Sequence, residues 1–542
     1  MSFSGARRVP PPQNDANLTY APGSAERAEL KAKLKAMAGQ RVDIPLVIGG
    51  CEVRTGTTAQ TVMPHNHRHV LADWHKAGRL EVEQAVAAAV AARPEWANWP
   101  WEERAAVFLR AAELLATTWR QTLNAATMLG QSKTAYQAEI DAASELIDFW
   151  RFNVAFAQEL YQEQPLSNHA TWNQSDYRGL EGFVYAVTPF NFTAIAGNLP
   201  GAPALMGCTV VWKPASSAML SAYYIVKLLE AAGLPPGVIN FVPGDASEVS
   251  NVVLDHPDFA GLHFTGSTGV FNSIWQRVGG NLAKYRSYPR IVGETGGKDF
   301  VVVHPSADPQ EVAVALVRGA FEYQGQKCSA ASRAYLPTSL WATVKERMLG
   351  MLAEIKIGDV RDFRNFMGAV IDEKAFTKIS DYLADARQNA TIIAGEAPNG
   401  KDGYFIPPTI VEASRPDYRL MCEEIFGPVL TVYVYEDRDW SNILKTVDTT
   451  SPYALTGAVF AADRRAVREA TLALRDAAGN FYINDKPTGA VVGQQPFGGA
   501  RSSGTNDKAG SKMNLLRWVS ARSVKETFSP PRDYRYPFMA EE

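Results

Sequence analysis

The chain has 542 residues, of which 46% are hydrophobic and 20% charged, so two or three domains of ordinary globular composition are expected. Its formal net charge of −3 gives no global reason to expect nucleic acid or an anionic membrane as a partner. The four cysteines show no CxxC spacing, which argues against a disulfide framework or a zinc knuckle and fits a reducing compartment.

The N-terminal stretch MSFSGARRVPPPQND lacks the apolar segment of a secretory signal. Arg7 and Arg8 could belong to an organelle transit peptide, but the stretch is short and carries three prolines at residues 10–12. We therefore expect a floppy tail on a cytoplasmic protein. No apolar run approaches the ~18 residues that a membrane span needs.

Residues 25–39 are predicted to form a helix that stops at a glycine, and residues 42–50 an extended segment. Residues 80–153 are expected to be mostly helical, because apolar positions recur there at three-four spacing. The polar, alternating residues 169–182 predict a strand or hairpin that leaves the main body.

The period then changes to short β-rich runs separated by helical segments. Such alternation is typical of a parallel sheet with helices on both faces. A further run at residues 299–303, followed by a helix through residue 321, predicts a second α/β lobe. The first set of runs lies at residues 183–187, 209–213, 239–242 and 261–264, with helices at 217–232 and 246–254.

Three clusters invite a functional interpretation but have a simpler one. Alternate histidines would share one face of an extended segment and could bind metal. No carboxylate or cysteine lies near them in sequence, so no metal site is expected. An acidic helical stripe is usually a solvated face, and a tryptophan cluster usually packs. The clusters are His65, His67 and His69; Asp141, Glu145 and Asp148; and Trp96, Trp99 and Trp101.

The stretch EYQGQKCSAASR, residues 322–333, places Cys328 directly after Lys327 and among small and polar neighbours. A structural cysteine usually packs in an apolar run as a small hydrophobe. The lysine would favour the thiolate, which is the reactive form. This window alone leaves both the reactive and the structural interpretation open.

Three strand ends carry further candidates. FTGSTG at residues 264–269 could hold a pyrophosphate on backbone N–H groups, or form a plain tight turn. Glu294 in GETGGK could be a general base if burial raises its pKa, or an exposed loop residue. Asn191 in PFNFT could donate to an oxyanion or cap a turn.

Taken together, a cysteine nucleophile, a carboxylate base, an amide donor and a nucleotide-binding sheet indicate one reaction. A thiolate attacks an aldehyde, hydride leaves to nicotinamide, and water cleaves the resulting thioester. The motifs PFNF, VVWKPA, FTGS, GETGGK, GQKC and EEIFGP occur in this order. With this order the chain, from about residue 26 to 527, resembles the aldehyde dehydrogenases. Within that family the closer resemblance is to the Δ1-pyrroline-5-carboxylate (L-glutamate-γ-semialdehyde) dehydrogenases of proline breakdown, carried by AEIDAASELIDFWRFN, FEYQGQKCSA and VVGQQPFGGARSSGTNDKAG.

The resemblance implies an α/β fold with a Rossmann-type cofactor domain, an α/β catalytic domain and a β oligomerisation flap. It makes Cys328 the nucleophile and Glu294 the base for the deacylating water. Asn191 and the backbone N–H of Cys328 would form the oxyanion hole. NAD is the implied cofactor, and its implied binding residues are Thr188, Pro189, Phe190, Lys213, Ser216, Gly266, Ser267, Glu424 and Phe426.

Within that set Lys213 and Glu424 would hold ribose hydroxyls, Ser267 the pyrophosphate, and Phe426 would lie near the nicotinamide ribose. Two positions depart from the family pattern. Phe271 stands where many members have glycine, and Ser216 where many NAD-specific members have glutamate, which leaves weak NADP use open.

The substrate's far end would be held by the loop at residues 488–499. Some relatives have serine where this chain has Ala490, so its own anchor is expected to be the backbone N–H groups of Gly489 and Ala490. Ser329 would assist, and Phe497 would pack on the aliphatic chain of the substrate.

The expected divisions are residues 1–168 and 187–296 for cofactor binding, 297–486 for catalysis, and 169–186 with 487–542 for the flap. The flap predicts at least a homodimer. Three alternatives stay open: an aldehyde dehydrogenase for another small semialdehyde, a cysteine hydrolase or acyltransferase without nicotinamide, and a non-catalytic protein on this fold.

Overall fold

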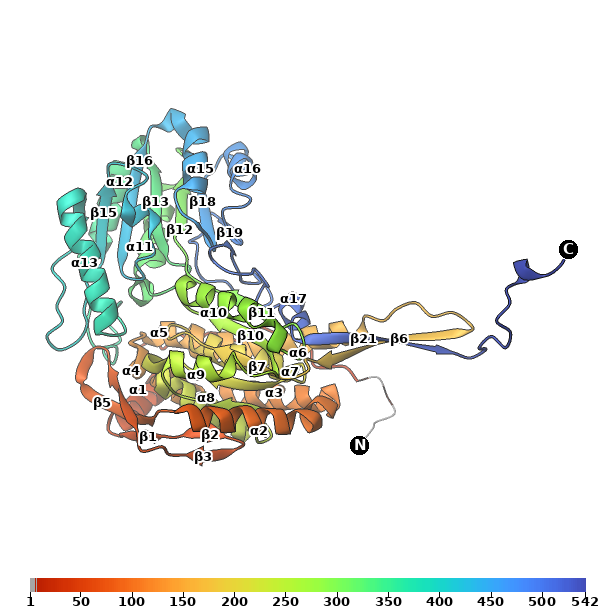
Figure 1. Ribbon diagram of the computed structural model, residues 1–542. Coiled ribbons are helices and arrows are strands. Elements are labelled where there is room, and N and C mark those ends of the chain that lie inside the picture. The colour runs from red at the N-terminus through yellow and green to blue at the C-terminus, as the bar shows by residue number, and fades with distance from the viewer. Residues whose placement is uncertain (1–4, 6) are drawn as a thin grey trace.

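The computed structural model describes residue 5 and residues 7–542. Its body consists of two lobes, each built on a seven-stranded sheet, with a narrow two-stranded arm that projects to one side (Figure 1). The predicted α/β class and the predicted second lobe are therefore confirmed.

The first sheet has the order β11-β10-β7-β8-β9-β2-β3. The five strands from β11 to β9 are parallel, and the apolar runs of β7, β8, β9 and β10 are almost fully buried because helices cover both faces. The order reverses between β7 and β10, which creates a ligand crevice at their carboxyl ends. The strands are β2 (Leu46–Ile48), β3 (Cys51–Val53), β7 (Phe183–Val187), β8 (Thr209–Lys213), β9 (Ile239–Phe241), β10 (Phe259–Thr265) and β11 (Arg290–Glu294).

The helices of this lobe include the expected N-terminal run, interrupted by one π-helical turn, η1 (Glu139–Glu145). The tryptophans of that run pack as expected, Trp96 against Trp99 and Trp101 against Tyr161. The helices are α1 (Ala25–Ala38), α2 (Arg79–Asn98), α3 (Trp101–Ala116), α4 (Arg120–Gln131), α5 (Ala135–Ala138), α6 (Leu146–Gln162), α7 (Thr193–Leu205), α8 (Met219–Ala232), α9 (Ala246–Val253) and α10 (Thr268–Gly280).

The second sheet has the order β14-β15-β16-β13-β12-β18-β19, and only β14 runs antiparallel to its neighbour. Its strands are β12 (Asp299–Val303), β13 (Ala331–Pro337), β14 (Thr391–Ala394), β15 (Thr409–Ala413), β16 (Val429–Tyr435), β18 (Thr456–Phe460) and β19 (Asn480–Ile483). Its helices are α11 (Pro309–Phe321), α12 (Thr338–Glu354), α13 (Glu373–Asn389), α14 (Arg419–Cys422), α15 (Trp440–Thr449) and α16 (Arg464–Ala473).

The extended segment before Gly50 divides between two sheets. β1 (Val42–Ile44) joins β5 (Asn66–His75) and β4 (Thr58–Met63), while β2 joins the first large sheet. The three alternate histidines lie in β5 and the turn before it, and each makes a hydrogen bond with a different partner. His65 bonds with the Ser132 hydroxyl, His67 with the Gly400 carbonyl oxygen, and His69 with the Ala38 carbonyl oxygen. Within the described residues no group of three or more His, Cys, Asp or Glu is arranged to hold a metal.

The expectation of a floppy tail is wrong for the described residues that precede α1. Val9 donates its N–H to Gln158 at 2.7 Å, and the Asp15 N–H donates to Asp148 at 2.7 Å. Arg120 in turn donates to Asp15 at 2.7 Å. Polar and charged partners on α4 and α6 hold this segment in place, which the proline-rich sequence alone does not reveal.

The arm is made of β6 (Thr171–Gly179) and β21 (Val519–Thr527), paired antiparallel along their whole length. Figure 1 shows it leaving the body, with the C-terminal residues beyond its tip. The expected flap boundary is too wide on both sides. Residues 183–186 pair inside the first sheet, and residues 488–510 return to the cavity described below. Short elements there are β17 (Tyr453–Ala454), β20 (Ala500–Arg501) and α17 (Lys512–Leu516).

Among the described helices none is long and apolar enough to cross a membrane.

Candidate active site

Cys328 lies at the interface of the two lobes, in the loop between α11 and β13. Its side chain faces Glu294, the last residue of β11, with 4.0 Å between Sγ and Oε1. The glycines of GETGGK make this approach possible. A Cβ on Gly297 would fall 2.2 Å from the Cys328 carbonyl oxygen, and one on Gly296 would fall 2.5 Å from Glu424.

The pKa of the Cys328 thiol is not lowered by Lys327, contrary to the expectation from the sequence. Burial, and then the charge of Glu294, raises the pKa of the Cys328 thiol well above its usual range. Lys327 does not offset this, because its ammonium turns to Glu322 at 3.5 Å, and burial lowers its own pKa to about 8. The prediction that Lys327 favours the thiolate is therefore wrong in this structure.

Glu294 fits the conditional prediction made from the sequence. Burial raises the pKa of its carboxyl to about 8, and the charge of Lys508 opposes that shift. A carboxyl with a pKa near the working pH can both take up and release a proton. Glu294 therefore has the chemistry of a general base, and it lies beside the sulfur of Cys328.

Asn191 follows β7 and is almost fully buried. Its Nδ2 donates to the Gln326 carbonyl oxygen at 3.1 Å, two residues before the nucleophile. Asp141 fixes the start of the following helix α7 by accepting the N–H groups of Thr193 and Ala194 at 3.0 and 2.8 Å. The amide is thus held beside the Cys328 loop, where an oxyanion donor must lie.

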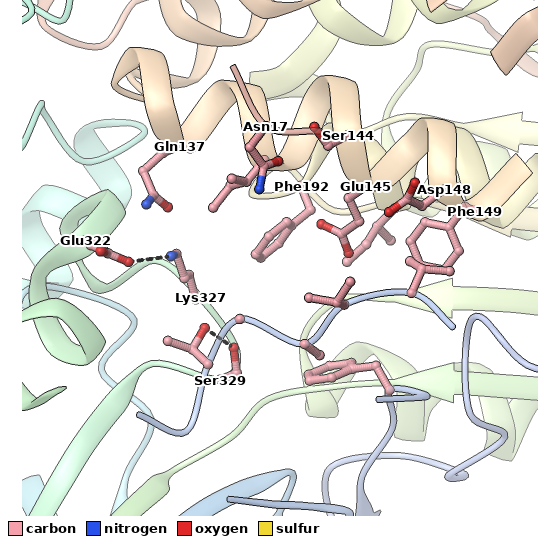
Figure 2. Close-up of a pocket in the computed structure, with 18 of the residues that line it drawn as sticks. Asn17, Gln137, Ser144, Glu145, Asp148, Phe149, Phe192, Glu322, Lys327 and Ser329 are labelled. Carbon is pink, nitrogen blue, oxygen red and sulfur yellow. Dashed lines mark hydrogen bonds and ion pairs between the residues drawn. The ribbon is translucent and has the colours of Figure 1, made fainter. Parts of the chain in front are cut away.

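A cavity of about 970 Å³ opens in front of Cys328 and Glu294. Its size suits a small organic ligand. Figure 2 shows Lys327 and Ser329 on one side and Glu145, Phe192 and Asp148 on the other. The expected substrate residues Ser329, Gly489, Ala490 and Phe497 all line it.

The acidic stripe is not solvated, contrary to expectation. Asp141 and Asp148 are buried, and Asp141 pairs with Lys133 at 2.7 Å. Glu145 lies at the end of the π-helical turn and points into the cavity (Figure 2), where burial raises its pKa well above the usual range. The available signal was that these acids stand among apolar residues, in AEIDAASELIDF, which leaves no continuous polar face.

The loop at residues 488–499 forms the far wall of the cavity. Ser329 donates to the Thr488 hydroxyl at 2.9 Å, which ties the loop to the neighbour of the nucleophile. Gly489 has φ of +101°, a conformation that favours glycine. Across the described residues the N–H groups of Gly489 and Ala490 donate to no protein acceptor, so both remain available to a ligand.

The expected cofactor residues lie outside this cavity, around the carboxyl edge of the first sheet. Lys213 ends β8, where burial lowers its pKa to about 8. Ser267 caps α10 by accepting the Val270 N–H at 3.4 Å. Glu424 accepts the Gly297 N–H at 2.9 Å. The remaining members are Thr188, which accepts from Trp212, the neighbouring Pro189, Gly266 at the β10 end, and Phe190, whose ring lies 5.8 Å from that of Phe426.

These groups fit a dinucleotide. The free N–H groups at the start of α10 suit a pyrophosphate, and a carboxylate with a buried ammonium suits ribose hydroxyls. The two departures have structural consequences. The ring of Phe271 fills the space beside Gly293. A Cβ atom added at Gly293 would lie 2.1 Å from that ring. Ser216 is exposed and presents no charge.

The sequence pattern of the Aldehyde dehydrogenase family matches residues 52–524, so the chain belongs to that family. Within this family the chain is highly similar to proteins of one branch. A solved structure described as the Delta-pyrroline-5-carboxylate dehydrogenase from Mycobacterium tuberculosis bound with NAD is 54% identical, with a TM-score of 0.96. The match covers 99% of this chain and 100% of that one.

Two curated relatives support the same branch. The mitochondrial Delta-1-pyrroline-5-carboxylate dehydrogenase of Dictyostelium discoideum is 52% identical, covering 99% of this chain and 98% of the relative. The human protein of the same name is 50% identical, covering 97% and 94%. The resemblance inferred from the motifs is therefore confirmed for the fold and the family branch.

Proposed function

We propose that this chain oxidises L-glutamate γ-semialdehyde, the open form of Δ1-pyrroline-5-carboxylate, to L-glutamate with NAD, the second step of proline breakdown. The observation that carries the proposal is the cavity that gathers Cys328, Glu294 and the free N–H groups of the loop at Gly489. The branch of the family to which the relatives belong supports it.

In the first step Cys328 is the nucleophile. Its thiol proton passes to Glu294, whose Oε1 lies 4.0 Å from Sγ, as the sulfur attacks the aldehyde carbon. The oxyanion that forms is stabilised by the Asn191 amide and the Cys328 backbone N–H. Bound NAD would supply the acceptor for the hydride that leaves the carbon attached to the Cys328 sulfur.

In the second step Glu294 acts as a base toward water. Glu294 first releases to solvent the proton that it took from the thiol. Its carboxylate then takes a proton from the water that attacks the thioester, and Cys328 leaves as the thiolate. Because the carboxyl pKa is about 8, only a minor fraction is ionised near neutrality, and that fraction grows as the pH rises. The buried site excludes other water, which limits side reactions.

The substrate is anchored at its amino-acid end. The Gly489 and Ala490 N–H groups bind the α-carboxylate, and Ser329 with Thr488 borders that end of the cavity. Phe497 packs on the aliphatic chain. The carboxyl of Glu145 lies opposite this loop (Figure 2) and lends the cavity a polar wall.

The residues that would hold NAD lie around the carboxyl ends of the strands of the first sheet. Ser267 and the start of α10 would hold the pyrophosphate, Lys213 and Glu424 would hold ribose hydroxyls, and the Phe190–Phe426 pair would border the nicotinamide end. The hydrogen bond from Gly297 to Glu424 keeps that carboxylate beside the nucleophile loop. Ser216 imposes little charge repulsion, so a measurable use of NADP is part of the proposal.

The test is NADH formation at 340 nm with NAD and L-glutamate γ-semialdehyde, compared with succinate semialdehyde and propanal. A kcat/KM at least tenfold higher for glutamate semialdehyde is expected, because neither competitor carries both charges of the amino-acid end. A preference for succinate semialdehyde would support the alternative, a dehydrogenase for another small semialdehyde. Absence of NADH with every aldehyde would leave the hydrolase or binding-protein alternatives.

We also propose that the chain forms at least a homodimer through the β6–β21 arm. Nearly all of β21 is exposed, and the chain beyond it exposes large apolar side chains such as Phe528 and Phe538. Exposed strand edges and apolar patches of this kind are normally covered by another chain. A monomeric mass by light scattering at micromolar concentration would contradict this.

The proposed compartment is the cytoplasm, since the cysteines stay free thiols, as a reducing compartment requires. Several relatives are named as mitochondrial proteins. Localisation of a tagged chain in its own cell distinguishes the two.

A further inference from the structure

The backbone just before the nucleophile is in an unusual conformation. Three consecutive residues are left-handed: Tyr323 with φ and ψ of 51° and 40°, Gln324 with 54° and 28°, and Gly325 with φ of 64°. Left-handed residues normally occur singly, and a bulky tyrosine rarely adopts this region. Such a turn persists only where the surroundings hold it in place, and strain of this kind clusters at functional sites.

The side chain of Gln324 supplies that hold. It is fully buried, and its amide makes three hydrogen bonds. Nε2 donates to the carbonyl oxygens of Ser132 at 3.0 Å and Ala369 at 2.7 Å, and Oε1 accepts the Gly368 N–H at 3.0 Å. Ser132 follows α4 in the first lobe, whereas residues 368 and 369 precede α13 in the second. One side chain therefore links the turn to both lobes.

The neighbouring contacts show what the turn positions. Gly325 packs against the EEIFGP loop, where a Cβ would lie 2.3 Å from the Gly427 carbonyl oxygen. Gln326 donates its N–H to the Tyr323 carbonyl at 3.0 Å, which closes the turn. The Gln326 carbonyl then accepts from Asn191 at 3.1 Å, and its Oε1 accepts the Ile371 N–H at 2.9 Å. A shift of the turn would move the oxyanion amide and Cys328 together.

We propose that Gln324 is a positioning residue, which fixes the left-handed turn and thereby sets Cys328 and Asn191 relative to each other. This inference rests on the proposed roles of those two residues. Gln324 touches neither substrate nor cofactor in this arrangement. Gln324 acts by restricting how far Cys328 can move from its reactive position. A displacement of the nucleophile near 1 Å can lower the rate roughly 100-fold.

The chain offers a matched control in Asn240 of β9, which does not line the cavity at Cys328. This amide is also fully buried and also makes three backbone bonds. Its Nδ2 donates to the carbonyls of Val210 at 3.3 Å and Gly237 at 2.8 Å, and its Oδ1 accepts the Gly49 N–H at 2.8 Å. Gln324→Met and Asn240→Leu therefore each remove three hydrogen bonds of the same kind, two donated to backbone carbonyls and one accepted from a backbone N–H, without adding charge.

The experiment measures the NADH burst, the KM for NAD and urea stability in both variants of the full-length protein. Both variants are expected to lose stability, but only Gln324→Met should lower the burst rate, by roughly 30- to 100-fold, with KM for NAD unchanged within about twofold. Equal burst rates in the two variants would overturn the inference. If Gln324→Met does not fold, Gln324→Gly removes the amide while allowing the left-handed conformation without strain, and a wild-type burst in that variant would also overturn it.

A second readout separates this inference from the proposed function. The rate of Cys328 alkylation by iodoacetamide, followed by mass spectrometry of its peptide, needs neither aldehyde nor NAD. We expect a change of about fivefold or more in Gln324→Met and none in Asn240→Leu, because thiol reactivity follows its local environment. Equal alkylation rates would overturn the positioning role, whereas a wild-type protein without dehydrogenase activity would overturn the proposed function only.

Discussion

The carboxyl of Glu294 predicts a distinctive pH dependence for thioester hydrolysis. Burial raises its pKa from the usual 4.5 to about 8, so the carboxyl is mostly protonated at neutral pH. Only the ionised form can take a proton from water. The ionised fraction rises from about 9% at pH 7 to about 91% at pH 9, so hydrolysis should accelerate roughly tenfold over that range.

The assay is stopped-flow detection of NADH in a single mixing experiment. The burst reports hydride transfer, and the slow phase reports hydrolysis where hydrolysis is slower. In the wild type the slow phase should rise with a midpoint near pH 8. In Glu294→Gln it should be flat with pH and slower by roughly 10²-fold or more, because an amide cannot act as a base.

Asp148 supplies the matched control, since burial raises its pKa to about 6 and it lines the same cavity. Asp148→Asn should keep the midpoint near 8, whereas a titrating Asp148 would place the midpoint about two units lower. A slow phase that is flat from pH 6.5 to 9.5 in the wild type, or one with a midpoint near 4.5, would refute the reasoning about Glu294.

The other predictions concern the nucleophile, the oxyanion donor and the anchoring loop. Cys328→Ala should abolish aldehyde oxidation while NAD still binds by fluorescence titration, and near-normal turnover would remove the central claim. Asn191→Ala should lower the burst rate by roughly 10²- to 10³-fold, and a change confined to KM would contradict an oxyanion role. Gly489→Val should raise KM for glutamate semialdehyde more than for propanal, because a β-branched residue disfavours φ near +101° at this position. Equal effects on both aldehydes would show that the loop does not recognise the charged end.

Local patterns predicted much of this molecule correctly. The short β-rich runs at 183–187 and 209–213 were placed to the residue, because a fully buried parallel strand needs an uninterrupted apolar run bounded by turn residues. The strand at 261–264 proved longer, Phe259–Thr265, and the helix expected from residue 217 begins at Met219 after a 3₁₀ turn. Such end shifts are expected, since terminal residues are fixed by capping and tertiary contacts.

The environment of charged residues was not accessible in the same way. Asp141 was expected on a solvated face, yet it is buried against Lys133 and caps α7. Lys327 was expected to lower the thiol pKa, yet its ammonium lies toward Glu322. Both errors have one cause: a charge is stabilised by whichever partner the fold brings to it, and that partner can be far away in sequence.

The sequence by itself determined the α/β alternation and the glycines that allow close approach, and its motifs singled out Cys328, Glu294 and Asn191 as the proposed catalytic residues. These depend on residue type and short-range spacing. Only the tertiary structure decided that Gln324 holds a left-handed turn between the lobes, that the N-terminal segment is pinned by Asp148, and that Glu145 faces the cavity. Those features arise from contacts between residues distant in the chain, and burial at such contacts sets both pKa and position.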